Sequence, residues 1–242
     1  MFDSVEANAQ MIFPYIIASD RAEVFSEDYF QRHFPLTWAY LSKFKEMLLK
    51  RNINSKEAKW YQFGRTQSLT EFHDSPKLIW HVLSTEPTYV YDEKNLKFTG
   101  GGNGPYYSLI SNSDYSPLYI LGILSHPLIE AMVKAGASEF RGAYYSHGKQ
   151  FIEDLPIRQI DFANAQERKQ YNDIVKTVKQ LIATRAKYNQ TYIGAKKIVL
   201  ERKFNYLNAS LINQINLLYE ITFDEVNTVL NDEMFLTDLN ED

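Results

Sequence analysis

Residues 140–149 contain the densest set of groups that could bind an anion, in the order Phe-Arg-Gly-Ala-Tyr-Tyr-Ser-His-Gly-Lys. Basic side chains can bond phosphate oxygens, and interleaved aromatic rings can stack or donate hydrogen bonds. The candidate contact residues here are Arg141, Tyr144, Tyr145, His147 and Lys149. This composition indicates a nucleic-acid contact, with a half-buried strand that has one wet face as the structural alternative.

A second candidate chemistry is metal-dependent DNA cleavage. Glu57 and Lys59 have the E-x-K spacing of nucleases in which two carboxylates hold magnesium and a lysine supports the attacking water. A partner carboxylate is missing from the sequence pattern, because Asp28 lies 29 residues upstream and no Pro-Asp dipeptide exists. We therefore expect a solvated helix end here, and no metal site.

A third candidate is methyl transfer from S-adenosylmethionine. Residues 98–102 match the F-x-G-x-G pattern of a methyltransferase cofactor loop, but that loop must run from a parallel strand into a helix. Here residues 103–105 lead into another strand pattern, which favours a glycine-rich hairpin loop. None of the eight prolines is followed by another, so the Pro-Pro-aromatic motif of adenine methylation is also absent. We expect no cofactor site in this chain.

Histidine and cysteine usage restricts the remaining chemistry. The five histidines, at positions 33, 73, 81, 126 and 147, have no metal-ligand spacing. Zero cysteines exclude disulfides, thiolate zinc sites and a cysteine nucleophile, and are typical of a reducing compartment. No apolar run approaches 18 residues, and the N-terminus lacks the layout of a signal peptide. We expect a cytoplasmic chain without a membrane partner.

The charge is segregated along the chain. Of 242 residues, 45% are hydrophobic, 23% charged and 14% aromatic, and the net charge is −4. Residues 168–203 carry ten basic and two acidic side chains, or +8, whereas residues 204–242 carry eight acids and no base, or −8. Residues 43–65 sum to +5. Local potential steers an anionic ligand more than the total does. The basic segment is either a phosphate-tracking surface or a solvated helix face that pairs with the acidic segment.

Hydrophobic periodicity predicts the elements that position these residues. Three- and four-residue steps through Trp38, Leu41, Phe44 and Leu48 predict a helix after Pro35. Period-two or β-branched patterns predict strands over residues 59–63, 77–82, 88–91, 95–99 and 106–110. The capping side chain of Ser116 before Pro117 predicts a short helix from residue 117, and Pro127 opens another short helix to about Lys134, which Gly136 stops.

A long helical hairpin is predicted from about Asn164 onward. Its seam consists of Tyr171, Ile174, Val178, Leu181, Tyr188, Leu200, Phe204, Leu207, Leu211 and Leu218. Residues 222–225 form a capping-box pattern that starts a last helix. The fold class expected is α+β, with a mainly antiparallel recognition domain over residues 1–160 and a helical hairpin over 161–242.

Five short motifs in fixed order resemble the TaqI-like specificity domain, the target recognition domain of adenine-specific DNA methyltransferases and type IIG restriction enzymes. The segments that carry the resemblance are residues 60–69, 76–79, 119–126, 141–150 and 155–157, with weaker similarity at 34–51, 160–162 and 218–225. Nearly the whole chain is covered.

The resemblance implies sequence-specific binding of double-stranded DNA by a fragment of a restriction-modification enzyme. It implies an N-terminal methyltransferase domain as partner, with S-adenosylmethionine and Mg²⁺ acting only in the parent enzyme. The expected DNA-binding residues are Arg65, Gln67, Arg141, Tyr144, Tyr145, His147 and Lys149. No catalytic residue is expected in these 242 residues. The alternative function is a protein-interaction or dimerisation module built on the hairpin, and an independent nuclease ranks third.

Overall fold

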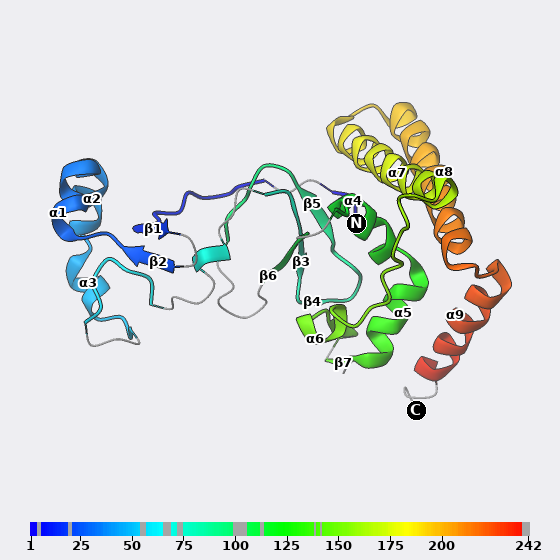
Figure 1. Cartoon of the computed structure of the whole chain (residues 1–242), viewed down its shortest axis with the longest axis horizontal. Helices are drawn as coiled ribbons and strands as arrows, with labels where there is room; N and C mark the ends of the chain where they lie inside the picture. Colours follow the sequence, from blue (N-terminus) through cyan, green and yellow to red (C-terminus); the bar gives the residue numbers. More distant parts are fainter. Residues whose placement is uncertain are drawn as a thin grey trace. The chain divides into compact units, whose positions relative to one another are not determined.

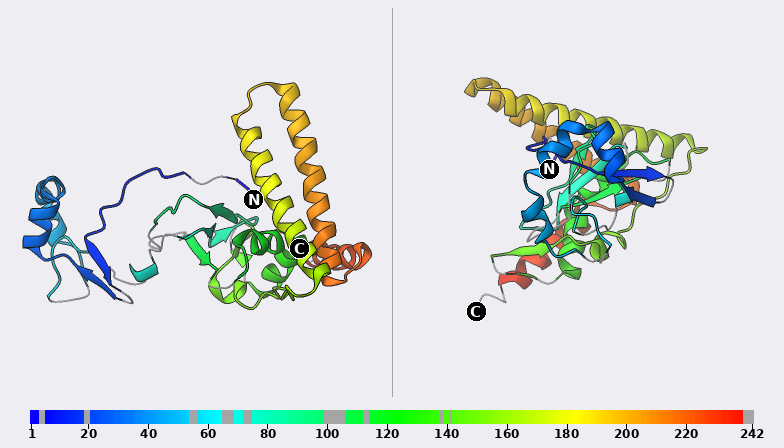
Figure 2. Two further views of the ribbon diagram at one scale, coloured as in Figure 1. Left: turned by 45° about the horizontal axis from the view of Figure 1, so that its top comes forward. Right: turned by 90° about the vertical axis from the view of Figure 1, so that its left-hand side faces the viewer.

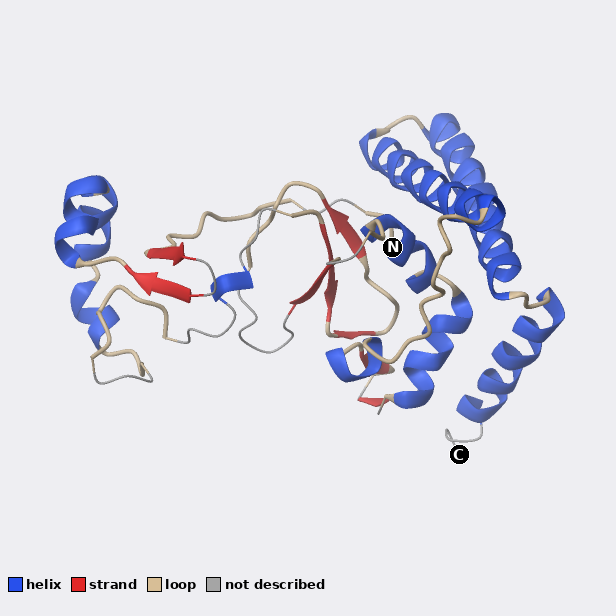
Figure 3. Cartoon of the chain, viewed as in Figure 1, coloured by secondary structure: helices blue, strands red, loops and turns tan. Residues whose placement is uncertain are grey.

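The computed structural model describes residues 1–3, 6–18, 21–53, 57–64, 69–71, 75–98, 106–111, 114–137, 139–140 and 142–238, with the backbone alone for residues 140 and 232–238. Contacts divide the chain into two compact units, unit 1 (Met1–Glu6 and Ser75–Asp242) and unit 2 (Ala7–Asp74). The boundary expected at residue 160 lies inside unit 1, because elements on both sides of it share one core. Helices and small antiparallel sheets make an α+β fold, as the sequence predicts (Figure 3).

Unit 2 is built around an aromatic core. The antiparallel hairpin of β1 (Tyr15–Ala18) and β2 (Arg21–Val24) leads into the short helices α1 (Glu27–His33), α2 (Pro35–Ser42) and α3 (Lys45–Leu49), and the unit also contains the single turn η1 (Leu69–Glu71). The helix expected from Pro35 is therefore broken at residues 43–44. Trp38, Leu41 and Leu48 pack onto the core as predicted, whereas Phe44 is exposed.

The strand predicted over residues 59–63 is wrong, because this segment is a turn. The Arg51 guanidinium donates to the carbonyls of Trp60 (2.7 Å) and Gln62 (3.0 Å), which holds the turn against α3. Both Trp60 and Tyr61 are buried. Burial raises the pKa of Tyr61 to about 12, and its hydroxyl donates to the Phe25 carbonyl at 2.6 Å. A side chain from outside the segment thus satisfies the carbonyls that a strand neighbour would have bonded.

Unit 1 contains two three-stranded sheets. In the first, β3 (Lys77–His81) lies between β5 (Val90–Asp92) and β6 (Tyr106–Ile110), and both pairings are antiparallel. In the second, β8 (Tyr144–Ser146) lies between β4 (Leu83–Ser84) and β7 (Glu139–Phe140). Only Val82 separates β3 from β4, so one extended segment of the chain enters both sheets (Figure 1).

The strands predicted near residues 77–82, 88–91 and 106–110 are confirmed, but the described residues 95–98 of the predicted strand 95–99 are a loop. The carboxylate of Asp92 causes the difference. It accepts the backbone N–H groups of Lys94 (2.9 Å) and Leu96 (2.8 Å), which turns the chain away from the sheet. The same carboxylate lies 2.8 Å from the buried ammonium of Lys77 on the neighbouring strand.

A short apolar helix occupies the middle of the unit 1 core. In α4 (Pro117–Leu124), six of the eight residues are buried, and the Ser116 side chain accepts the Leu118 N–H at 3.2 Å as the predicted cap. The following helix α5 (Pro127–Gly136) ends at Gly136, as expected. At Gly122, α7 approaches so closely that an added Cβ would lie 2.8 Å from Ile174 Cγ2.

The predicted hairpin is confirmed as α7 (Ala165–Gln190) and α8 (Gly194–Tyr219), which lie side by side (Figure 2). Its seam is buried at Ile174, Val178, Leu181, Leu207 and Leu211, and these residues belong to the same core as α4. The capping box is also confirmed: the Thr222 N–H donates to the Glu225 carboxylate (2.7 Å), and the Glu225 N–H donates to Thr222 Oγ1 (3.2 Å). It starts α9 (Phe223–Asp238).

No single helix among the described residues is both long and apolar enough to cross a membrane. One pair, α4 and α5, meets the length and composition criteria jointly despite a 73° bend.

Replacing Gly122 with alanine should destabilise unit 1. Alanine favours a helix by about 1 kcal/mol over glycine, but its Cβ would lie 2.8 Å from Ile174 Cγ2 and 3.2 Å from Val178 Cγ2. We expect a net loss of about 1–3 kcal/mol in the free energy of unfolding from overpacking, measured by urea denaturation. Gly194→Ala is the matched control, because no atom lies within 4 Å of its added Cβ. Equal stability of the two variants would contradict the close approach.

The stability of unit 1 should also depend on the protonation of His126. Its Nδ1 accepts the Leu128 N–H (3.2 Å) and caps α5, and its Nε2 lies 2.9 Å from Asn216 Oδ1. Burial lowers the pKa of His126, and the Asn216 hydrogen bond offsets part of that effect. In the unfolded chain, His126 therefore binds a proton near pH 6.5, whereas in the folded chain it does so only at lower pH. As the pH falls below about 6.5, the free energy of unfolding should decrease.

The variant His126→Asn keeps a short capping group and removes the titration, so its stability should depend less on pH than that of the wild type. His81→Asn, at an exposed position, is the control. Unfolding free energies at about pH 7.5 and 5.5 measure the difference. An unchanged pH dependence in His126→Asn would contradict this assignment.

Candidate nucleic-acid interface

The candidate interface is the segment that begins at β8. Tyr145 pairs with Ser84 of β4 on one side and with Glu139 of β7 on the other. Gly142 and Ala143 precede β8 with positive φ angles of 83° and 57°, which turn the chain back along β7. Such a conformation is accessible to glycine and strained for alanine, so packing on either side must hold the turn in place.

His147 fixes the end of β8 to three other elements. Its N–H donates to the Val82 carbonyl (2.6 Å), and its own carbonyl accepts from Trp80 Nε1 (2.8 Å). Its Nε2 lies 3.1 Å from both carboxylate oxygens of Glu130 on α5, and its Nδ1 lies 3.2 Å from Ser84 Oγ. Because a carboxylate only accepts, Nε2 carries the proton of that hydrogen bond.

The His147 network also includes a buried tyrosine and a lysine. Tyr89 packs edge-to-face on the imidazole, with ring centroids 6.2 Å apart, and burial followed by the nearby Glu130 charge raises the Tyr89 pKa. The Lys134 ammonium lies 4.0 Å from a Glu130 oxygen and 5.4 Å from the centroid of the Tyr145 ring. The packing therefore extends from the buried imidazole to the half-buried ring of Tyr145.

Two side chains around this network face solvent. Tyr144 is 45% exposed. Lys149, the first residue of α6 (Lys149–Ile152), has a side chain that is 79% exposed, and its ammonium lies 3.5 Å from Glu153. An exposed ion pair of this kind contributes little to stability, so the ammonium can exchange its partner for a phosphate.

The four described members of the predicted site, Tyr144, Tyr145, His147 and Lys149, lie on the short segment from β8 to the first residue of α6. Arg65, Gln67 and Arg141 lie outside the described residues. His147 is only 1% exposed, and both of its ring nitrogens are paired. In this arrangement its ring cannot reach a ligand on the surface, so we assign it a positioning role instead of direct DNA contact.

Exposed aromatic side chains on the two faces of the first sheet were missed by the sequence interpretation. Tyr106 and Tyr107 of β6 are both exposed, and His81, opposite Tyr106 in the register of β3, has its ring centroid 4.2 Å from that of Tyr106. In the sequence, the only sign of these exposed rings is the pair Tyr106 and Tyr107 after the glycine cluster. Their pattern predicts only a strand, and the long-range pairing with β3 is needed to locate His81 beside them.

The described residues offer little support for the nuclease, cofactor and metal sites considered from the sequence. The Lys59 ammonium donates to the Phe25 carbonyl (3.3 Å), so it acts as a structural group. Residues 99–105 of the glycine cluster lie outside the described residues. Within the described part of the chain, no group of three or more His, Asp or Glu side chains could hold a metal ion.

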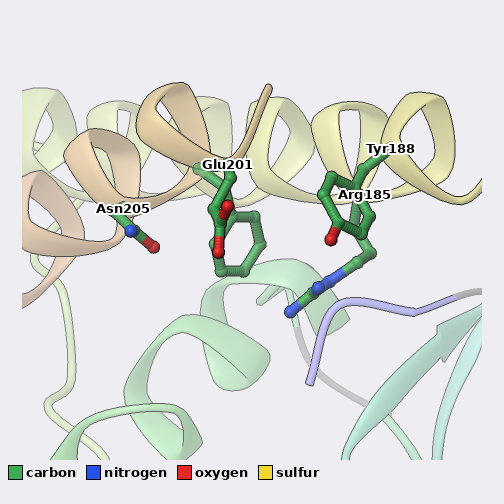
Figure 4. A pocket seen from close by; sticks show the side chains of 5 residues that line it. Arg185, Tyr188, Glu201 and Asn205 are labelled. Carbon is green, nitrogen blue, oxygen red and sulfur yellow. The ribbon is translucent and has the colours of Figure 1, made fainter. Parts of the chain in front are cut away.

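A pocket between α7 and α8 is lined by Arg185, Tyr188, Glu201, Phe204 and Asn205. Arg185 extends from its helix toward the N-terminal segment (Figure 4). Its guanidinium lies 4.3 Å from the centroid of the Phe204 ring, and its Nε lies 3.9 Å from Asp3 Oδ1. Asn189 also donates to Asp3 Oδ1 at 3.0 Å. The contacts of Arg185 therefore anchor the N-terminal segment to the hairpin.

Replacing His147 with phenylalanine should destabilise the candidate interface. Glu130, at 9% exposure, would lose its hydrogen bonds to the imidazole and keep only the Lys134 ammonium at 4.0 Å, and loss of a hydrogen-bond partner by a buried polar group costs about 1–3 kcal/mol. Denaturant midpoints should fall accordingly, and hydrogen exchange should accelerate at the amides of β8. Tyr144→Phe, at an exposed position, is the control and should change stability by no more than about 0.5 kcal/mol. Unchanged exchange at β8 in His147→Phe would show that the network does not position this strand.

The chain was compared with protein-family models and with known proteins. No protein-family model matches it, so the TaqI-like resemblance stays a prediction. The chain is 26% identical over 227 residues to the type II restriction enzyme and methyltransferase RM.Eco57I of Escherichia coli. The aligned region covers 91% of this chain and 23% of that enzyme, so the chain spans about a quarter of the relative's length.

Proposed function

We propose that this chain recognises a short double-stranded DNA sequence as the target recognition domain of a restriction-modification enzyme, either an adenine methyltransferase or a type IIG restriction enzyme. The observation that carries the proposal is the similarity to RM.Eco57I over 91% of the chain. An enzyme that both cleaves and methylates must select its site, and 23% of its length is a suitable size for a domain with that task.

The surface chemistry supports a DNA-facing role for residues 144–149. Tyr144 and Lys149 are exposed at the two ends of this segment, while the buried His147 network holds the backbone between them. A preorganised surface gives up little conformational entropy on binding, which favours specific recognition. Tyr106 and His81 add exposed aromatic groups on one face of the adjoining sheet segment.

Arginine and glutamine are proposed to contact bases, and lysine is proposed to contact a phosphate. Arginine can bond guanine with two hydrogen bonds, and glutamine can do the same with adenine. Arg141, Arg65 and Gln67 are therefore the proposed base-contact residues, on the basis of residue type and position in the sequence. Lys149 presents a single point charge and is proposed to bind a phosphate.

Catalysis is assigned to the rest of the parent enzyme. A base inside a duplex must be flipped out before methylation, and that chemistry requires a cofactor domain for S-adenosylmethionine, with Mg²⁺ for cleavage. The proposed partner of this chain is an N-terminal methyltransferase domain. The role proposed for these 242 residues is to position that domain on its site, without a catalytic residue of their own.

A protein-interaction module is the second candidate function, because α8 exposes large apolar side chains. These are Ile198, Val199, Tyr206 and Leu217. Apolar and aromatic side chains of this kind are enriched in the cores of protein interfaces. Sedimentation velocity at increasing concentration distinguishes this candidate: concentration-dependent self-association that is abolished by Tyr206→Ser would favour it.

Lys149→Ala should weaken binding to all duplexes alike, because a phosphate contact carries no base information. Arg141→Ala should cost about 1–3 kcal/mol on the preferred site and relax preference at one position. Fluorescence anisotropy with a preferred and a scrambled duplex measures both effects, and Lys94→Ala, at an exposed lysine after β5, is the charge-matched control. If wild type and variants bind both duplexes equally at low salt, this segment does not select the sequence.

A further inference from the structure

We propose that the outward side of α7 is a second DNA-contact surface, which binds the phosphate backbone without sequence preference. The inference rests on the proposed function, since it adds a contact to the same duplex. We term this surface the α7 basic row. Its members are Arg168, Lys169, Lys176, Lys179 and Lys187.

The helical repeat places these five side chains on one side of α7. Lys169, Lys176 and Lys187 are separated by seven and eleven residues, two spacings that return to the same side of an α-helix. All five members are exposed, and the opposite side of α7 is buried in the core shared with α4. From residue 168 to 187 the row extends about 28 Å at 1.5 Å per residue. This length corresponds to about eight base pairs of B-DNA.

The charge of the α7 basic row is largely uncompensated. Between its basic members, the same side of the helix carries Asn172, Gln180 and Ala183, and Asp173 is the one acid at its edge. The Lys169 ammonium lies 3.9 Å from Asp173, and Arg168 donates to the Phe162 carbonyl at 3.0 Å. Lys176, Lys179 and Lys187 form no ion pair with another described residue. A solvated helix normally intersperses both signs of charge, so a one-sign surface favours an anionic partner.

The absence of apolar groups distinguishes a DNA backbone from a protein partner. None of the exposed large apolar side chains in the described part of the chain lies on α7, whereas α8 presents several. Protein interfaces depend on buried aromatic or aliphatic anchors, which the outward side of α7 lacks. Lysine, arginine, asparagine and glutamine side chains are the groups that bond phosphate oxygens. The α7 basic row therefore fits the repeated charges of a DNA strand.

The test compares two triple variants of the full chain. Lys176→Gln, Lys179→Gln and Lys187→Gln together remove three charges from the α7 basic row. Lys196→Gln, Arg202→Gln and Lys203→Gln together remove three charges from the other arm of the hairpin and serve as the matched control. Fluorescence anisotropy measures binding of each protein to a preferred duplex and a scrambled one over a series of salt concentrations.

The α7 variant should bind both duplexes more weakly than wild type by the same factor and keep its preference for one of them. Its log-log salt dependence should be shallower by about 0.9 for each phosphate that is no longer neutralised, or about 2.7 for three. The control should retain the wild-type slope. Circular dichroism should show the same helix content in all three proteins, since every substituted residue is on the hairpin surface or its edge.

Each remaining outcome is decisive. If both triple variants bind DNA equally weakly, the effect is one of net charge and the α7 basic row is overturned as a specific surface. If the α7 variant matches wild type while site preference is present, the inference fails and the proposed function stands. If no protein prefers either duplex but the α7 variant still binds both more weakly, the recognition proposal fails and the α7 contact stands. If wild type binds no duplex, both fail.

Discussion

The burial of α4 is the constraint on which the rest of unit 1 depends. Six of its eight residues are buried, so this helix requires packing partners on several sides at once. The first sheet contributes Leu78 and Trp80 to that core, and the hairpin of α7 and α8 contributes Ile174, Val178 and Leu211. Gly122 allows α7 to approach within contact distance of the α4 backbone. The hairpin therefore contributes a large part of this core, which residues before and after position 160 share.

The same framework positions the surface that we assign to DNA. Trp80 is part of the core and donates to the carbonyl of His147, which connects the buried sheet to the end of β8. Glu130 on α5 fixes the imidazole from the other side. Both ring nitrogens and both backbone polar groups of His147 are paired, so an alternative arrangement would leave at least one of them without a partner. Tyr144 and Lys149 thus extend from a segment whose backbone is held on both sides.

Local signals predicted the helical part of the fold well, and long-range hydrogen bonds explain the failures. The capping box at Thr222, the caps before α4 and α7 and the buried seam of the hairpin all depend on residues near in sequence. The strand predicted at residues 59–63 is a turn because Arg51 bonds its carbonyls, and the loop after β5 follows from Asp92.

The candidate site could be predicted only in part for the same reason. Basic and aromatic neighbours in the sequence indicated that residues 140–149 meet a ligand, but burial of His147 depends on Ser84 and Glu130, which are 63 and 17 residues away. The sequence alone did not show that His147 is buried beneath this surface, whereas Tyr144 and Lys149 are exposed on it. The basic character of α7 was visible as a charge count, whereas the outward position of the α7 basic row required the direction of the core.

Selection from a randomised duplex library tests whether this chain recognises a DNA sequence. The pure chain is incubated with duplexes of random sequence at low salt, and the retained DNA is sequenced after several rounds. Sequence-specific recognition predicts enrichment of one short sequence, because specific contacts discriminate each base pair by about 1–3 kcal/mol. Retention of DNA without enrichment of any sequence, or no retention at all, would contradict it.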